Sequence, residues 1–157
     1  MTAFTVRVAE GPADREACFA VRRAVFVVEQ QVPEDVEYDA YDATALHVLA
    51  VGADGPLGTG RLLYGPRALA RTGSAQVGSL GRLAVTGAAR GLGVGAALVR
   101  AIEAAAAERG LSAVDLHAQT HALGFYERLG YEAYGPEFPD AGIEHRAMRR
   151  TLAQRSA

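Results

Sequence analysis

The sequence has no lysine and no tryptophan, and it contains a single cysteine. Without lysine the chain cannot form a P-loop of the GxxxxGK[ST] type, in which a lysine contacts the nucleotide phosphates. One cysteine, Cys18, excludes an internal disulfide and is typical of proteins from a reducing cytoplasm. A net charge of −2 lacks the basic excess of a general nucleic-acid-binding protein.

Long apolar stretches are also missing from the sequence. No apolar run approaches the roughly 20 residues of a membrane-spanning helix, and the first residues lack the apolar core of a signal peptide. We therefore expect a cytoplasmic protein without a membrane segment. The remaining composition is that of a folded protein, with 157 residues, 50% of them hydrophobic and 22% charged. A chain of this size and composition predicts one domain over residues 1–157.

Hydrophobic periodicity predicts strands and helices in alternation. Apolar residues alternate over residues 4–8, which predicts a strand, and an apolar stripe after Pro12 predicts a helix to about residue 28. Further strands are expected at residues 45–52, 57–64, 79–85, 112–118, 131–135 and 143–150, and further helices from residue 94 to Gly110 and at 121–129. Residues 65–77 predict a loop with at most one helical turn. This order predicts an α/β domain with a mixed sheet and helices on its faces.

A glycine-rich stretch, RGLGVG at residues 90–95, separates a predicted strand from a predicted helix. Glycines at the start of a helix leave backbone N–H groups open to an anion. The dinucleotide pattern GxGxxG/A matches as Gly91-x-Gly93-x-x-Ala96. That pattern normally follows its strand almost directly, whereas five residues separate Val85 from Gly91. A turn that only caps the helix is the other simple interpretation.

A third pattern, R/Q-x-x-G-x-G/A, matches in full as Arg90-x-x-Gly93-x-Gly95. After the next predicted strand, residues 119–131 read QTHALGFYERLGY. Together these stretches resemble the GNAT superfamily of N-acetyltransferases, which shows N-x-x-A-x-x-FYxxxGF after its glycine loop. Gln119 stands in place of the asparagine and Tyr131 in place of the phenylalanine. The stretches VRRAVFVVEQQVPEDVEYDAYD, LHAQ and GIEHRAM resemble the ElaA-like branch of that superfamily.

This resemblance implies a fold and a co-substrate. The fold is a mixed, mostly antiparallel sheet of six to seven strands, flanked by about four helices, with a splayed central strand pair that holds the cofactor. The co-substrate is acetyl-coenzyme A, whose pyrophosphate binds the glycine loop and whose pantetheine arm follows the preceding strand; no metal is implied. The resemblance places at the coenzyme Leu83, Ala84, Val85, Arg90, Gly91, Leu92, Gly93, Val94, Gly95, Ala96, Gln119 and Tyr126.

The resemblance also implies direct acetyl transfer to an amine, which needs a proton acceptor for the amine and a proton donor for the departing sulfur. Tyr126 is the candidate general acid, although it could instead be a core aromatic residue beside Phe125. Residues 29–42 carry six acids and no basic residue, and they are expected to form either an acidic rim at the acceptor or a solvated loop. Glu29, which follows the apolar face of the first helix, and His145 in the last strand are the candidate bases.

The cysteine and two of the histidines are not expected to take part in catalysis or metal binding. Cys18 lies in the apolar stripe of the first helix without a histidine–aspartate context, so we expect no nucleophilic role. His117 and His121 have helical spacing but straddle a strand end and a helix start, so we expect no metal.

The expected partner is a small-molecule or peptide amine, with no nucleic acid and no membrane, and a homodimer is left open. Three alternatives remain. Glu37-x-Asp39-x-Tyr41-Asp42 after Arg23-x-x-Phe26 resembles acyl-homoserine-lactone synthases, which acylate S-adenosylmethionine. Against this alternative, the chain is short, lacks tryptophan and keeps a full pyrophosphate loop. A non-catalytic coenzyme A-binding regulatory module and an NAD-binding protein are the other two.

Overall fold

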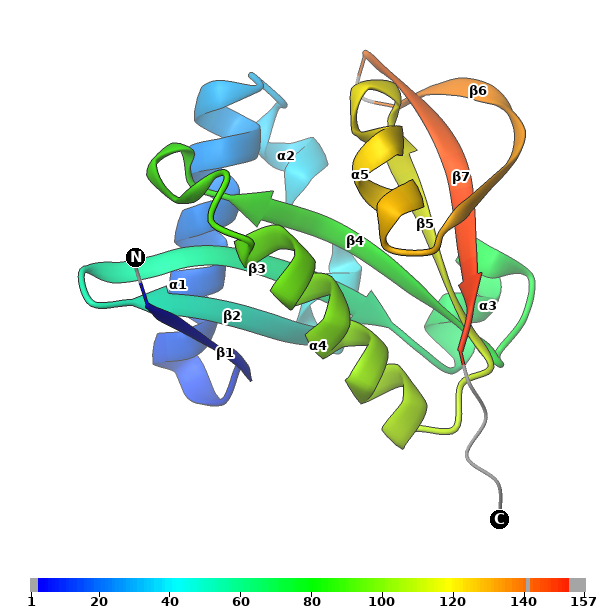
Figure 1. Ribbon diagram of the computed structural model, residues 1–157, viewed down its shortest axis with the longest axis horizontal. Coiled ribbons are helices and arrows are strands. Elements are labelled where there is room, and N and C mark those ends of the chain that lie inside the picture. The colour runs from blue at the N-terminus through cyan, green and yellow to red at the C-terminus, as the bar shows by residue number, and fades with distance from the viewer. Residues whose placement is uncertain (1–2, 141, 153–157) are drawn as a thin grey trace. The chain divides into compact units, whose positions relative to one another are not determined.

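One mixed sheet runs through the structure. The computed structural model describes residues 3–140 and 142–152, in which seven strands follow the order β1-β2-β3-β4-β5-β7-β6 (Figure 1). β4 and β5 are parallel, whereas β1–β2, β2–β3, β5–β7 and β6–β7 are antiparallel, which confirms the predicted mixed sheet. The strands are β1 (Phe4–Val8), β2 (Leu46–Gly52), β3 (Gly55–Leu63), β4 (Val77–Val85), β5 (Ala113–Gln119), β6 (Glu132–Asp140) and β7 (Ile143–Thr151).

Two of the helical segments are long. α1 (Gly11–Arg22) continues into the π-helical segment η1 (Arg23–Glu29), in agreement with the helix predicted to about residue 28. α4 (Val94–Glu108) follows the glycine loop and ends before Gly110, also as predicted. The shorter segments are α2 (Glu34–Glu37), η2 (Ala40–Ala43), α3 (Pro66–Thr72), η3 (Gly87–Ala89), η4 (Thr120–Ala122) and α5 (Leu123–Arg128).

Two predicted boundaries are wrong. α3 has seven residues, where at most one helical turn was expected. β6 continues to Asp140, although the sequence predicted its end at residue 135. Glycine and proline at positions 135 and 136 predict the end of a strand. The strand continues instead, and its register with β7 shifts between Tyr134 and Phe138. Such an irregularity accommodates glycine and proline without ending the strand.

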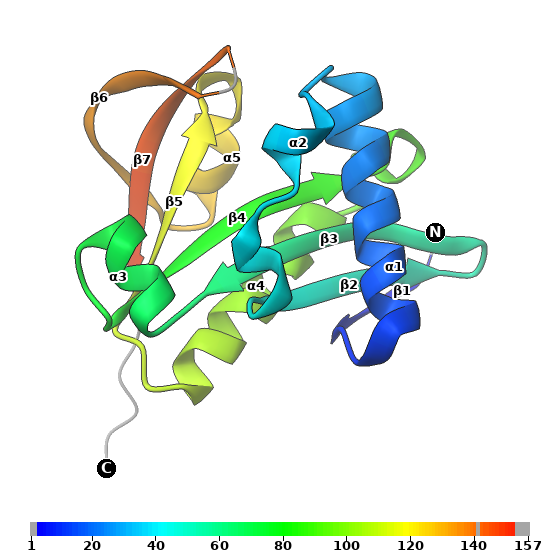
Figure 2. The same cartoon turned by 180° about the vertical axis from the view of Figure 1, so that it is seen from behind.

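The chain forms two compact units, and the single domain predicted from the sequence stays a prediction. Unit 1 consists of Met1–Leu62 and Arg82–Ala104, and unit 2 of Leu63–Gly81 and Ala105–Ala157. In unit 1, α1 lies on one face of β2 and β3, and α4 lies on the other face (Figures 1 and 2). In unit 2, β5 pairs with β7, β7 pairs with β6, and α5 contacts β5 and β6.

The close packing of β3 in unit 1 depends on Gly58. A β-carbon on Gly58 would lie 3.0 Å from the carbonyl oxygen of Ala84 and 3.1 Å from Cγ1 of Val94. These distances leave no room for a side chain, so a glycine is needed at this position. Its absent side chain lets β3 approach both the end of β4 and the first turn of α4. The two segments on either side of the glycine loop are therefore packed against the same strand.

A buried network of ion pairs links α1 to the acidic segment and to β3. Arg22 is 0% exposed, and its Nε donates to Glu37 Oε1 at 2.7 Å while Nη1 donates to Asp42 Oδ1 at 2.6 Å. Arg61 of β3, which is 2% exposed, donates to the same Asp42 oxygen at 2.9 Å. A buried charge is tolerated only when it is paired and hydrogen-bonded. The acidic residues 37 and 42 therefore hold their segment in place by neutralising two buried arginines.

This network generates a prediction for Asp42→Asn. Burial alone would raise the pKa of Asp42, but the hydrogen bonds and charge of Arg22 outweigh it and lower the pKa to about 2. A depressed carboxyl pKa stabilises the fold above the ordinary pKa of the unfolded chain, and this stabilisation, about 2 kcal/mol, is lost as the pH falls from about 4 to about 2. We expect Asp42→Asn to lower the free energy of unfolding at pH 7 by about 3 kcal/mol, because it leaves buried arginine charge uncompensated.

Urea unfolding of the wild type and of Asp42→Asn at pH 7 and at pH 3 checks this. The difference between the two proteins should narrow at the lower pH, because only the wild type loses stability there through residue 42. Asp35→Asn is the matched control, since Asp35 is exposed and forms no ion pair within the described chain. An unchanged difference at both pH values would contradict the assignment.

Candidate active site

The site residues predicted from the sequence are divided between the two units. Unit 1 contains Glu29, residues 83–85 at the end of β4 and the glycine loop with the start of α4. Unit 2 contains Gln119 at the end of β5, Tyr126 in α5 and His145 in β7. Each group has a local geometry that bears on its predicted role.

The end of β4 departs from regular strand geometry at Arg82. The parallel ladder pairs Val77–Leu80 with Ala113–Leu116, and β4 continues beyond it to Val85. Arg82 has a φ of 52°, which is strained for a residue with a side chain. Its Nε donates to the carbonyl oxygen of Glu37 at 3.0 Å. This bond ties the residue that precedes 83–85 to the acidic segment.

The glycine loop leaves donors open at the start of α4. Gly93 has a φ of 83°, a conformation that favours glycine, and its carbonyl accepts the N–H of Ala97 at 3.1 Å. Within residues 3–140 and 142–152, no acceptor is found for the backbone N–H groups of residues 91–96. Unpaired N–H groups at a helix N-terminus carry partial positive charge and suit a phosphate. The local geometry therefore fits the pyrophosphate that the sequence predicted here.

Arg90 and Glu29 are joined directly by an ion pair. Nη1 and Nη2 of Arg90 donate to the two oxygens of Glu29 at 2.6 and 2.9 Å, and Nε donates to the carbonyl oxygen of Val85 at 3.1 Å. The hydrogen bond to Arg90 lowers the pKa of Glu29. A carboxylate held in this way keeps its charge and is a weak proton acceptor. The arginine predicted to bind a phosphate thus binds a carboxylate through the same fork of donors.

The acidic segment at residues 29–42 is largely neutralised by arginines. Besides Glu29, four of its acids form ion pairs, so Asp35 is the one without a pair in the described part of the chain. Most of these acidic side chains are therefore neutralised by a neighbouring arginine, and their place at the acceptor stays a prediction. The four pairs are Glu34 with Arg23, Glu37 with Arg22, Asp39 with Arg61, and Asp42 with Arg22.

Tyr126 of α5 is a buried residue. It is 8% exposed, and its ring makes edge contacts with Phe125 at 4.9 Å and Tyr131 at 5.9 Å between centroids. Burial raises the pKa of the Tyr126 phenol, so the hydroxyl keeps its proton at neutral pH. No described residue hydrogen-bonds this hydroxyl. Tyr126 therefore combines a core ring with an uncommitted proton donor.

Gln119 and His145 lie opposite each other on neighbouring strands. Gln119 of β5 pairs in register with His145 of β7, so the two side chains share one face of the sheet. His145 is 9% exposed, and its Nδ1 lies 2.6 Å from the carbonyl oxygen of Ile143. The imidazole stacks on Phe138 of β6, with centroids 6.0 Å apart.

Cys18 and His47 lie in the core of unit 1. Cys18 is buried, and burial raises the pKa of its thiol, which disfavours the reactive thiolate. His47 is buried as well, with its Nε2 3.0 Å from the carbonyl oxygen of Asp42. Over the described residues, no cluster of three metal-ligating side chains is found. The same residues include no helix that is both long and apolar enough to cross a membrane.

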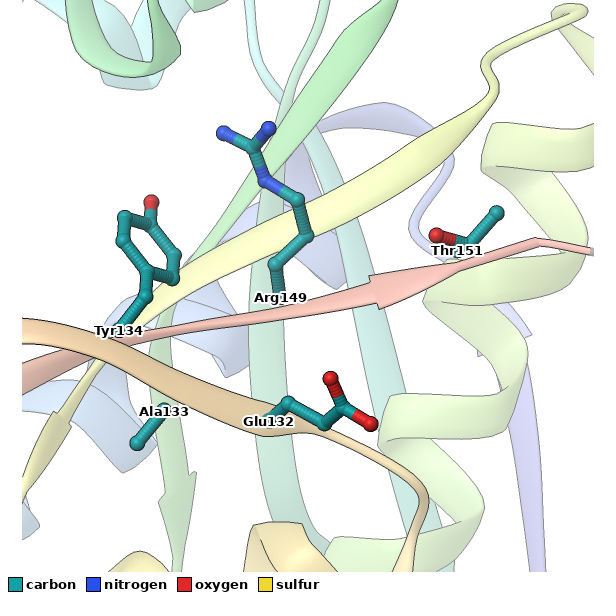
Figure 3. A pocket seen from close by; sticks show the side chains of 5 residues that line it. All are labelled: Glu132, Ala133, Tyr134, Arg149 and Thr151. Carbon is teal, nitrogen blue, oxygen red and sulfur yellow. The ribbon is translucent and has the colours of Figure 1, made fainter.

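A surface depression of about 320 Å³ in unit 2 contains none of the predicted site residues (Figure 3). Two of its polar side chains are already engaged, because Arg149 Nη2 donates to Asp115 Oδ2 at 2.7 Å and the Tyr134 hydroxyl donates to the same carboxylate. We therefore assign no role to this depression. It is lined by Glu132, Ala133, Tyr134, Arg149 and Thr151.

Comparison with known proteins agrees with this geometry. The profile of the acetyltransferase (GNAT) domain family matches residues 14–152. YjcF of Bacillus subtilis, described as an uncharacterized N-acetyltransferase, is 38% identical over 133 residues, which cover 84% of this chain and 89% of YjcF. A crystal structure of an acyl-CoA N-acyltransferase from Pseudomonas aeruginosa has a TM-score of 0.77 and 31% identity, covering 96% of this chain and 99% of that one.

Escherichia coli ElaA provides a second structural comparison, with a TM-score of 0.78 and 26% identity over 96% of this chain and 99% of ElaA. The resemblance to the ElaA-like branch seen in the sequence is thus matched by a likeness in three dimensions. The family profile covers most of the chain, and the fold agrees with it. The chain belongs to the GNAT family of acetyltransferases.

Proposed function

We propose that the chain transfers the acetyl group of acetyl-coenzyme A directly to the amine of a small molecule or a peptide. The supporting observation is the anion-binding character of the loop at residues 90–96. Arg90 binds the Glu29 carboxylate with two parallel hydrogen bonds. The adjacent backbone N–H groups of residues 91–96 have no acceptor in the described chain. Carboxylate oxygens stand here in the place of phosphate oxygens, which the same fork of donors also binds bidentately.

The roles proposed for the chain's residues are those that the family resemblance implies. The loop residues from Arg90 to Ala96 hold the pyrophosphate, and Leu83, Ala84 and Val85 offer backbone groups to the pantetheine arm. A backbone N–H of Ala84 or Val85 polarises the thioester carbonyl, whose activated acetyl group is what the co-substrate supplies. Tyr126 donates its proton to the departing sulfur; the hydroxyl is protonated at neutral pH and makes no hydrogen bond within the described residues. Gln119 is assigned to coenzyme binding.

Glu29 is assigned to control of coenzyme affinity rather than to proton transfer. Its lowered pKa disfavours a role as base, whereas its carboxylate competes with the pyrophosphate for the Arg90 guanidinium. Coenzyme binding therefore requires that the pair between Glu29 and Arg90 opens or is shared. This cost is small, because exposed ion pairs contribute little.

The alternatives predict different outcomes. An acyl-homoserine-lactone-synthase-like enzyme supplied by a carrier protein has no need of the pyrophosphate loop. A regulatory module that only binds coenzyme A leaves Tyr126 without a chemical role, so substitution of Tyr126 separates it from an enzyme.

Substitution of Glu29 by glutamine tests the competition. Glu29→Gln should raise the affinity for coenzyme A about threefold, because a negative charge beside the pyrophosphate is removed and Arg90 is released. The gain should shrink at high salt, which screens exposed charges. Calorimetric titration measures both effects, with Asp35→Asn as a control that removes an unpaired charge from the same segment. Unchanged affinity together with a loss of turnover would instead return Glu29 to the role of a base.

Substitution of Tyr126 by phenylalanine tests the proposed acid. Tyr126→Phe should lower kcat at least tenfold and leave the Kd for acetyl-coenzyme A unchanged, because the ring is kept and only the proton donor is lost. Thiol release in the presence of an amine gives the rate, and calorimetry gives the Kd. Tyr131→Phe, in the adjacent ring, is the matched control. Equal turnover in Tyr126→Phe and the wild type would leave Tyr126 as a core residue alone.

A further inference from the structure

Three side chains form a row across neighbouring strands of unit 2. His145 of β7 pairs in register with Gln119 of β5 on one side and with Phe138 of β6 on the other. Residues paired in this way present their side chains on the same face of a sheet. His117 joins the row from β5, since its ring meets the Phe138 ring edge-on with centroids 5.0 Å apart. The row thus combines aromatic surface with one imidazole at its centre.

The hydrogen bond of His145 fixes which ring nitrogen can accept a proton. Nδ1 lies 2.6 Å from the carbonyl oxygen of Ile143, and a carbonyl oxygen can only accept a hydrogen bond. The neutral imidazole must therefore carry its proton on Nδ1, which leaves a lone pair on Nε2. No described residue donates a hydrogen bond to Nε2. Stacking on Phe138 holds the ring plane, so this lone pair has a fixed direction.

A carboxylate without an ion pair in the described residues lies on the same face of unit 2. Asp140 pairs with Ile143, two positions along each strand from the pair of Phe138 with His145, so its side chain shares their face. Asp140 is exposed and has no ion pair within the described residues. Partial burial lowers the pKa of His117; the charge of Asp115 opposes this shift, the charge of Arg71 adds to it, and the charge of Asp140 opposes it. The negative charge of Asp140 therefore acts on the aromatic row, together with the opposing charge of Arg71.

We propose that this face binds the acceptor, that the acceptor is an aliphatic amine that is cationic at neutral pH, and that His145 Nε2 takes its proton. The proposal rests on the acetyltransferase function proposed above and names the substrate class and the base. Phe138 and His117 contact the carbon chain of the amine, and Asp140 attracts its charge. An arylamine is neutral at pH 7. The charge of Asp140 therefore does not attract it, and it has no ammonium proton for His145 to remove.

The proton balance of this step is complete. Nε2 of His145 accepts one proton from the ammonium group, which frees the nitrogen lone pair to form the C–N bond as the C–S bond of the thioester breaks. The sulfur takes the proton of the Tyr126 hydroxyl, and the second proton of the nitrogen restores that hydroxyl. The proton on Nε2 then passes to water. Each turnover thus yields an amide, a thiol and one proton in solution.

The first experiment observes the histidine side chains of the protein in the absence of acetyl transfer. Nitrogen-15 NMR of the histidine side chains should show His145 as the tautomer with its proton on Nδ1, and addition of butylamine should shift its Nε2 signal. Aniline should leave that signal unchanged, and Asp140→Asn should weaken the response to butylamine at least threefold. A tautomer protonated on Nε2, or an equal response to aniline, would overturn the proposal even if the protein acetylates amines.

The second experiment uses initial rates of thiol release with acetyl-coenzyme A and butylamine. His145→Gln keeps a donor for the Ile143 carbonyl and should lower kcat about 100-fold with little change in KM, whereas Asp140→Asn should raise KM and spare kcat. Free imidazole should restore part of the activity of His145→Ala. His121→Gln, an exposed histidine of the same unit, is the matched control. Equal rates for His145→Gln and His121→Gln would overturn the proposal, whereas failure of wild-type protein to bind acetyl-coenzyme A would refute the proposed function instead.

Discussion

The buried charge of Arg22 is the constraint on which unit 1 depends. A guanidinium that is 0% exposed must be neutralised inside the protein, and the Glu37 and Asp42 carboxylates do this at 2.7 and 2.6 Å. The rings of Phe19 and Tyr38 lie against the same guanidinium, with its central carbon 5.1 and 5.4 Å from their centroids. The acidic segment is fixed by these contacts, and through the Glu37 carbonyl it holds Arg82 just before residues 83–85.

A second arginine gives the glycine loop its chemistry. Arg90 ties the end of β4 to the end of η1, because it donates both to the Val85 carbonyl and to the Glu29 carboxylate. The donors that hold this internal anion are the ones that a pyrophosphate would use. Under the proposed function, coenzyme affinity draws on the same hydrogen bonds as this internal ion pair, and Glu29 competes with the ligand. The sequence predicted Glu29 as a candidate base, and its lowered pKa disfavours that role.

The fold could be predicted because its signals are local. The Arg90-x-x-Gly93-x-Gly95 loop and the stretch at 119–131 have fixed spacings, and the strands around them alternate regularly. The ion pairs could not be predicted, because Arg22 and Asp42 are far apart in sequence and meet only in the folded chain. The tautomer of His145 depends on the carbonyl of Ile143 at the start of β7, and sequence patterns say nothing of such a contact. The predicted β6 was too short, because Gly135 and Pro136 lie within a register shift that lets the strand continue past them.

Calorimetric titration of the wild-type protein with acetyl-coenzyme A, coenzyme A and NAD tests the central claim most directly. The account predicts micromolar binding of both coenzyme A ligands and no heat from NAD, since the loop at residues 90–96 is assigned to the coenzyme A pyrophosphate. No heat of binding from either coenzyme A ligand, or equal binding of NAD, would contradict that assignment. Absence of binding by both coenzyme A ligands would leave the glycines as a helix cap and would favour an acyl donor carried on a protein.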